Sequence, residues 1–288
     1  MLFRRQKYIL SLLESLPYHP TKIELTKLTF LLGYETNLRR HGSFYDFLPY
    51  KFGPFSFTLS KELESLGQEK LITAENNKIR IIESKLVGKA TKDVCTHDKQ
   101  EIQSIIKHYA GVRGKKLIDI VYKKYPWYAT RSVTCAKHRT LEFDQNTVFT
   151  IGYEGKSIDY FLNLLLKKNV KKIIDVRSNT ISRKYGFSRN DLGLFCNKIN
   201  VKYCGISQLG IPSKLRRNLK TSQDYKNIFH QYETTWLPEV PEHLNALFLK
   251  IKEEPSALLC FESNASMCHR GVLANVCAMS SGYKVVHI

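Results

Sequence analysis

Residues 147–176 read TVFTIGYEGKSIDYFLNLLLKKNVKKIIDV, and this stretch decides the fold class of the C-terminal part. The apolar runs at 147–151 and 170–176 predict strands, and the amphipathic segment at 157–168 predicts a helix between them. The same alternation continues along the chain, with strands expected at 201–204, 257–261 and 284–288 and helices at 189–199, 223–233, 241–252 and 270–279. Strands that alternate with helices predict an α/β fold with an open, mostly parallel sheet and helices on both faces.

The N-terminal part is richer in predicted helices. Apolar residues at helical spacing predict a helix at 4–16 and a second helix that Thr21 caps. We interpret Gly53-Pro54 as a turn before a third helix at 55–66, which Gly67 ends.

Two short apolar runs, at 71–73 and 79–82, flank an Asn-rich turn and predict a hairpin. Helices followed by a small hairpin are typical of a winged helix, in which the third helix enters a major groove and the hairpin touches the backbone or the minor groove. On this interpretation the groove and wing contacts are Lys61, Lys78 and Arg80. The alternative is a winged-helix-like module that binds protein.

Further helices are expected near 97–109 and 114–125, and residues 131–146 are predicted to be a polar connector. We therefore expect two domains: a winged-helix-like and helical domain at 1–143, and an α/β domain at 144–288. The length of 288 residues fits two domains of ordinary size.

The chain carries a formal net charge of +19, and this charge is unevenly placed. Residues 176–223 contain ten basic residues and a single acidic one, Asp191. This stretch carries the whole net charge of the C-terminal part, because the basic and acidic residues in the remainder of that part balance. Such an excess favours a polyanionic partner, because Lys and Arg displace counterions from a phosphate backbone. We expect that partner to be double-stranded DNA; a basic surface kept for solubility is the alternative.

No apolar run in the sequence approaches the length of a membrane span. The first residues mimic a signal peptide, but Glu14 breaks the apolar stretch and no small-residue cleavage site follows. The seven cysteines show no paired spacing, which indicates free thiols in a reducing compartment. We expect a cytoplasmic protein without a membrane partner.

Polar side chains follow the predicted strands, at the edge where open α/β sheets bind ligands. They are Tyr153 and Glu154 after the first strand, Asp175 and Arg177 after the second, Glu262 after the strand at 257–261, and Cys268, His269 and Arg270 at the mouth of the helix that follows. A helix start favours an anion. We expect these side chains to line one pocket.

Several of these residues belong to a series of ordered motifs. The motifs are Thr150-Ile151-Gly152-Tyr153-Glu154-Gly155-Lys156-Ser157, Ile174-Asp175-Val176-Arg177, Ser182-Arg183 with Gly186-Phe187-Ser188, Leu209-Gly210-Ile211-Pro212-Ser213 with Arg216, and Leu259-Cys260-Phe261-Glu262 with Cys268-His269-Arg270. This series, over about 148–274, resembles the family called domain of unknown function 488, and the resemblance implies a Rossmann-like α/β domain. The N-terminal part more weakly resembles winged-helix modules of antitoxin and phage-defence proteins.

Asp175 or Glu262 is the predicted catalytic residue, because a carboxylate stabilises the cationic sugar formed in glycosidic cleavage or acts as a general base. On DNA this chemistry is base excision: a flipped, modified or damaged base would stack on Tyr153. We therefore predict a DNA glycosylase, with phage defence as one setting. The expected nucleic-acid contacts are Lys61, Lys78, Arg80, Arg183, Lys184, Arg189, Lys214, Arg216, Arg217 and Lys220.

Other functions stay open at this point. Cys268 at a helix start would make a nucleophile, and residues 144–156 superficially fit a nuclease pattern. A DNA-binding regulator that senses a nucleotide-like ligand is the main alternative. A zinc site from Cys260, Cys268, His269 and Cys277 lacks paired-ligand spacing, so we predict neither a metal nor a cofactor.

Overall fold

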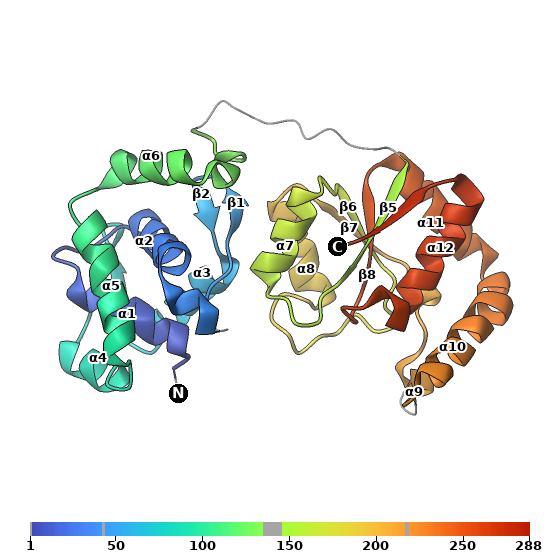
Figure 1. Cartoon of the computed structure of the whole chain (residues 1–288), viewed down its shortest axis with the longest axis horizontal. Helices are drawn as coiled ribbons and strands as arrows, with labels where there is room; N and C mark the ends of the chain where they lie inside the picture. Colours follow the sequence, from blue (N-terminus) through green and yellow to red (C-terminus); the bar gives the residue numbers. More distant parts are fainter. Residues whose placement is uncertain (1, 42–43, 135–145, 217–218) are drawn as a thin grey trace. The chain divides into compact units, whose positions relative to one another are not determined.

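The computed structural model describes residues 2–41, 44–134, 146–216 and 219–288 (Figure 1). By its internal contacts the chain divides into two compact units, Met1–Arg139 and Thr140–Ile288. The boundary predicted near residue 144 lies outside the described residues.

The N-terminal unit is α-rich, as expected, and contains two small hairpins. Its helices are α1 (Arg4–Ser15), α2 (Lys22–Glu35), η1 (Asn37–His41), α3 (Phe57–Gln68), α4 (Ser84–Ala90), α5 (Thr96–Tyr109), α6 (Gly114–Lys124) and η2 (Pro126–Ala129). Its strands are β1 (Leu48–Tyr50), β2 (Gly53–Phe55), β3 (Ile72–Glu75) and β4 (Lys78–Ile81), paired β1 with β2 and β3 with β4. Thr21 caps α2 as predicted, because its side chain accepts from the Glu24 N–H while the Glu24 carboxylate accepts from the Thr21 N–H.

Two local predictions in this unit are wrong. Gly53 and Pro54 do not form the turn before the third helix; they lie in β2, opposite Tyr50 and Pro49. Helix α3 starts only after Ser56, whose hydroxyl accepts from the Leu59 N–H. It also continues through Gly67 to Gln68, so the predicted stop is one residue inside the helix.

The predicted hairpin at β3 and β4 is confirmed. Asn76 and Asn77 form its turn with positive φ angles of 50° and 60°, a conformation that asparagine tolerates better than most residues. Lys78 also makes an antiparallel bridge to Thr21, and the Ile79 N–H donates to the Pro20 carbonyl. The segment before α2 therefore extends the hairpin on one side.

The C-terminal unit is built on a parallel sheet, which confirms the α/β prediction. Its strands are β5 (Thr147–Gly152), β6 (Lys172–Asp175), β7 (Lys202–Gly205), β8 (Ser256–Cys260) and β9 (Lys284–His287). Among the described residues they form one sheet in the order β7-β6-β8-β5-β9, and each neighbouring pair is parallel. Its helices are α7 (Ile158–Lys167), α8 (Arg189–Lys198), η3 (Ser207–Leu209), α9 (Ser213–Arg216), α10 (Ser222–Gln231), η4 (Tyr232–Trp236), η5 (Leu237–Glu239), α11 (Pro241–Glu253), η6 (Ala265–Met267) and α12 (His269–Ser281).

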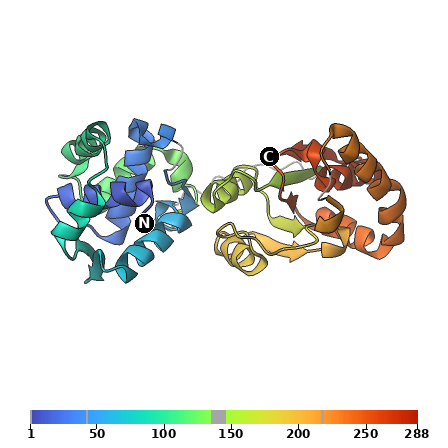
Figure 2. The ribbon, with the colours of Figure 1, turned by 90° about the horizontal axis from the view of Figure 1, so that it is seen from below.

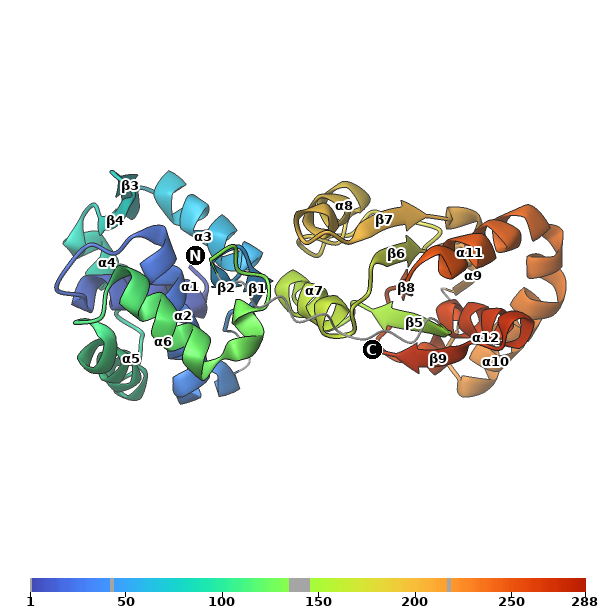
Figure 3. The ribbon, with the colours of Figure 1, turned by 90° about the horizontal axis from the view of Figure 1, so that it is seen from above.

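Helices cover both faces of this sheet. Figures 1 and 3 show α7 and α8 on one face and α11 and α12 on the other, and Figure 2 shows the same layers from below. Every residue of β5, β6 and β8 is buried, which explains why these strands appear in the sequence as unbroken apolar runs. On the α11 and α12 face, Val148, Ile174 and Leu258 pack against Leu247 and Leu273.

None of the helices in the described residues is long and apolar enough to span a membrane.

Candidate functional site

The carboxyl ends of β6, β8 and β5 lie next to one another in the sheet. Asp175 is in register with Leu259, and Gly152 with Cys260. The loops that follow these three strands therefore share one edge, as the sequence predicts. The side chains on them do not have equal roles.

Asp175 is fully buried, and both of its carboxylate oxygens accept hydrogen bonds. Arg177 donates from Nε to its Oδ1 at 2.8 Å and from Nη2 to its Oδ2 at 2.6 Å. Tyr203 also donates to Oδ2, at 2.6 Å, and the Asp175 side chain is 0% exposed. Both oxygens are thus occupied and closed to solvent, and we assign Asp175 to holding Arg177 rather than to acting as a general base.

Arg177 extends the same network. Its Nη1 donates to the Tyr153 hydroxyl and to the Phe187 carbonyl. The carboxylate of Asp175 outweighs the cost of burial and raises the pKa of Arg177, while burial and the same carboxylate raise the pKa of Tyr203. The charged guanidinium of Arg177 therefore connects the end of β6 to the loop that follows β5 through hydrogen bonds.

Tyr153 does not offer a face for a flipped base. Its ring stacks on Phe187 with centroids 4.4 Å apart, and Phe261 packs edge-on against it. The residue is only 5% exposed, whereas Phe261 is 43% exposed. The exposed ring at this edge is Phe261, which was not among the contacts predicted from the sequence.

Glu262 is the candidate carboxylate that is partly open. Its side chain is 23% exposed, and Arg216 donates from Nη1 to Oε1 at 2.5 Å. Burial alone would raise the pKa of Glu262. Hydrogen bonds from Cys268 and the backbone, together with the charge of Arg216, lower this pKa below its usual value. Arg216 was predicted to contact nucleic acid, and in the structure it holds the candidate catalytic group.

The backbone of Glu262 is fixed from two sides. A Cβ atom on Gly152 would lie 1.7 Å from the Glu262 carbonyl oxygen, so only glycine permits this approach. Arg270, which is 1% exposed, donates from Nη1 to the same oxygen and from Nη2 to the Ser263 carbonyl. Arg270 therefore shapes the loop after β8.

Glu154 has a local structural role. It is exposed, and its Oε2 accepts from the backbone N–H and the hydroxyl of Ser263. Its own N–H donates to the Phe261 carbonyl at 2.9 Å. These bonds tie the loop after β5 to the loop after β8.

Two lysines, from different loops, donate to backbone carbonyls at the end of β5 and just after it. Lys156 Nζ donates to the Gly152 carbonyl at 2.8 Å, and Lys184 Nζ donates to the Tyr153 carbonyl at 3.1 Å. Burial lowers both pKa values, and the charges of Arg270 and Lys184 lower that of Lys156 further. Lys156 belongs to the opening motif but was not predicted as a site residue, because a lysine after a glycine resembles an ordinary solvent-exposed loop residue.

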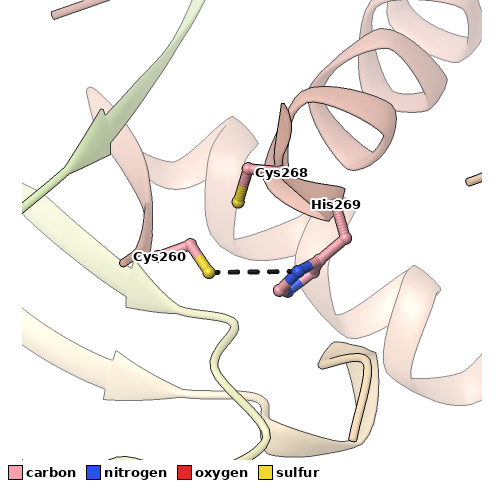
Figure 4. A group of neighbouring side chains, drawn as sticks. All are labelled: Cys260, Cys268 and His269. Carbon is pink, nitrogen blue, oxygen red and sulfur yellow. Dashed lines mark hydrogen bonds between the residues drawn. The ribbon is translucent and has the colours of Figure 1, made fainter. Parts of the chain in front are cut away.

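Cys260, Cys268 and His269 lie close together at the end of β8 and the start of α12 (Figure 4). All three are buried, with at most 2% exposure. Cys260 donates to Glu262 Oε2 at 3.3 Å, and its Sγ lies 3.9 Å from His269 Nδ1. Burial raises the pKa of the Cys268 thiol well above its usual range, which argues against Cys268 as a ready thiolate nucleophile.

The basic stretch at 176–223 is only partly directed to solvent. Its exposed members among the predicted contacts are Arg183, Arg189, Lys214 and Lys220. Arg177 and Arg216 hold carboxylates inside the unit, and Lys202 pairs with Glu254 at 2.9 Å. Arg217 lies outside the described residues.

The three residues predicted as N-terminal nucleic-acid contacts lie on helix α3 and strand β4. Lys61 is on the exposed face of α3, and Lys78 opens β4. Arg80 is on the same strand, 42% exposed and 4.0 Å from the Glu75 carboxylate.

Comparison with known proteins identifies a family only for the C-terminal unit. Residues 157–277 match the family model described as domain of unknown function DUF488. No curated protein and no solved structure matches the chain.

Proposed function

We propose that this chain, whose C-terminal part is a domain of the DUF488 family, is a DNA-binding enzyme that cleaves the N-glycosidic bond of a modified or damaged base. The carrying observation is the position of Glu262. The buried carboxylate of Asp175 accepts hydrogen bonds from Arg177 and Tyr203, and the carboxylate of Glu154 accepts one from the Ser263 N–H. The carboxylate of Glu262, by contrast, is partly exposed to solvent at the carboxyl ends of the strands.

The surroundings of Glu262 suit a nucleotide. Phe261 precedes it with an exposed ring, and stacking on an aromatic side chain is the usual way to hold an extruded base. Lys156 lies on the loop after β5, and Lys184, on the loop after β6, donates to the Tyr153 carbonyl of that loop. The charge of both lysines favours a phosphate. A carboxylate at this place would stabilise the cationic sugar or activate the attacking water.

The N-terminal unit supports DNA as the substrate. Its helices, its hairpin β3–β4 and the bridge from Thr21 to Lys78 follow the element order of a winged helix. On this proposal Lys61 on α3 and Lys78 with Arg80 on the hairpin contact the duplex.

The test uses the full chain and duplexes that each carry one oxidised, deaminated, alkylated or hydroxymethylated base. Alkali converts an abasic site into a strand break, so breaks that need alkali report base excision. Glu262→Gln should lower this activity at least about 100-fold while DNA affinity is kept. Glu239→Gln, at an exposed carboxylate in η5, is the matched control and should be fully active.

Two results would count against the proposal. Strand breaks that appear without alkali would indicate a nuclease. Intact strands across the whole panel, with DNA binding retained, would favour a regulator that senses a nucleotide-like ligand.

A further inference from the structure

We propose that Cys260, Cys268 and His269 form a binding site for one zinc ion. One donor atom from each residue lies within 4.8 Å of the other two. The inference is independent of the proposed function, because metal binding is measured without DNA.

The distances suit a tetrahedral metal. Zinc bonds thiolate at ~2.3 Å and imidazole at ~2.0 Å, so two of its ligands stand roughly 3.5–3.8 Å apart. The Cys260 Sγ and the His269 Nδ1 are already 3.9 Å apart. Small side-chain adjustments would therefore complete the geometry.

The hydrogen bonding of His269 fixes which nitrogen is available. Its Nε2 is 2.9 Å from the Val176 carbonyl oxygen, which can only accept, so Nε2 carries a proton. In the neutral ring Nδ1 then keeps its lone pair, and Figure 4 shows it turned toward Cys260. A backbone carbonyl that holds the second ring nitrogen is the outer-shell arrangement common to metal-binding histidines.

Regular secondary structure holds the three residues. Cys260 ends β8, Cys268 occupies the N-cap position of α12, and His269 is the first residue of this helix. A Cβ atom on Gly271 would lie 2.4 Å from the Ala265 carbonyl oxygen, so η6 packs tightly on the first turn of this helix. The ligands are thus set in place by strand, helix and loop rather than by a mobile segment.

The ligand set selects the type of metal and leaves one position open. Two thiolates and an imidazole favour zinc over magnesium or calcium, which prefer oxygen. Glu262 borders the thiols, with Oε2 at 3.3 Å from Cys260 Sγ, but it is not part of the three-residue group. Three protein ligands with an open fourth position are the pattern of catalytic rather than structural zinc sites.

The first test is metal content. The full chain, purified without chelator, should contain about one zinc per chain by elemental mass spectrometry, and the apoprotein should take up one equivalent. Cobalt(II) bound to the wild-type apoprotein should give the intense visible bands of a tetrahedral site and a thiolate charge-transfer band. This measurement does not depend on the folding of any variant.

The second test uses matched variants. Cys268→Ser and His269→Gln should each lower zinc affinity at least about 100-fold, because each removes a ligand. Cys277→Ser, on the same helix and equally buried but in the hydrophobic core, should bind zinc as the wild type does. Circular dichroism identifies any variant that fails to fold.

Three results would overturn the proposal. One is a folded wild-type chain that binds neither zinc nor cobalt; another is an equal loss of metal in Cys277→Ser. The third is a disulfide between Cys260 and Cys268 in the protein as purified, seen as two thiols that react with an alkylating reagent, after unfolding in the presence of a chelator, only when a reductant is added.

Discussion

Arg177 grips Asp175 through two parallel hydrogen bonds, from Nε and Nη2, and both side chains are at most 5% exposed. Removing one partner of a buried ion pair leaves the other charge uncompensated. Asp175→Asn is therefore expected to destabilise the C-terminal unit by about 3–5 kcal/mol. Hydrogen exchange of the amides in β6 reports this unit alone.

The matched control is Asp191→Asn, at an exposed acid in the first turn of α8. Its effect should stay within about 0.5 kcal/mol. If Asp175→Asn is as stable as this control and only its activity is lost, the assignment of Asp175 as a positioning residue is wrong.

Gly152→Ala tests the close approach of β5 to the loop that carries Glu262. The added Cβ would collide with the Glu262 carbonyl, so the loop must move. We expect a decrease of about 1–3 kcal/mol in stability and a fall in base-excision activity of at least about 10-fold, because the carboxylate is displaced.

Gly193→Ala is the control for this change. Its Cβ would meet Tyr203 at 3.7 Å, an ordinary contact, within α8. Since alanine is favoured over glycine inside a helix, this variant should be stabilised by roughly 0.5–1 kcal/mol and stay active. Equal activity in both variants would show that the position of Glu262 does not matter.

Phe261→Ala tests the exposed ring beside Glu262. Stacking on an aromatic contributes about 1–3 kcal/mol per base, so the affinity for a duplex with an extruded fluorescent base analogue should fall roughly 5- to 150-fold. Phe52→Ala, at a ring 44% exposed in the N-terminal unit, serves as the control. A decrease of the same size in both variants would remove Phe261 from the nucleotide site.

The fold of the C-terminal unit was largely predictable. Its central strands are buried on both faces and therefore stand out as apolar runs between amphipathic helices. The N-terminal hairpin β1–β2 was missed because Gly53-Pro54 has the composition of a turn. In the structure Gly53 supplies a φ of +90° at the start of a short strand.

The sequence predicted at which edge of the sheet the site lies, but it did not predict the role of each side chain there. An Asp two residues before an Arg has the same sequence pattern in a catalytic site and in an internal ion pair, and only the contacts of Asp175 separate the two. The group of Cys260, Cys268 and His269 was rejected for its spacing. Spacing rules describe ligands on one loop or helix, whereas these come from the end of β8 and the start of α12.

The buried Lys27 should make the stability of the N-terminal unit depend on pH in an unusual way. It is 2% exposed, its Nζ donates to the Pro54 carbonyl, and burial lowers its pKa from 10.5 to about 7. Between these two pKa values the unfolded chain binds the proton that the native chain has released. Stability therefore rises with pH across this window, and the full penalty of burial applies below it.

Lys27→Met should accordingly be more stable than the wild type by roughly a few kcal/mol at about pH 6, with the gain shrinking toward about pH 10. Unfolding followed by hydrogen exchange in α2 at several pH values measures this difference. Lys22→Met, exposed on the same helix, should show no such trend. A constant difference between Lys27→Met and the wild type would mean that Lys27 is charged in the native state throughout.

The salt dependence of DNA binding tests which of the exposed lysines contact the DNA backbone. Lys214, Lys220 and Lys202 are all exposed, and Lys202 pairs with Glu254. Removing one lysine that binds a phosphate should reduce the slope of log affinity against log salt by about 0.9. Lys214→Gln with Lys220→Gln should therefore flatten the slope by up to about 2, and Lys202→Gln should leave it unchanged. Fluorescence anisotropy with one duplex at several salt concentrations gives the slopes. If Lys202→Gln alone flattened the slope, DNA would bind along β7 rather than at Lys214 in α9 and at Lys220.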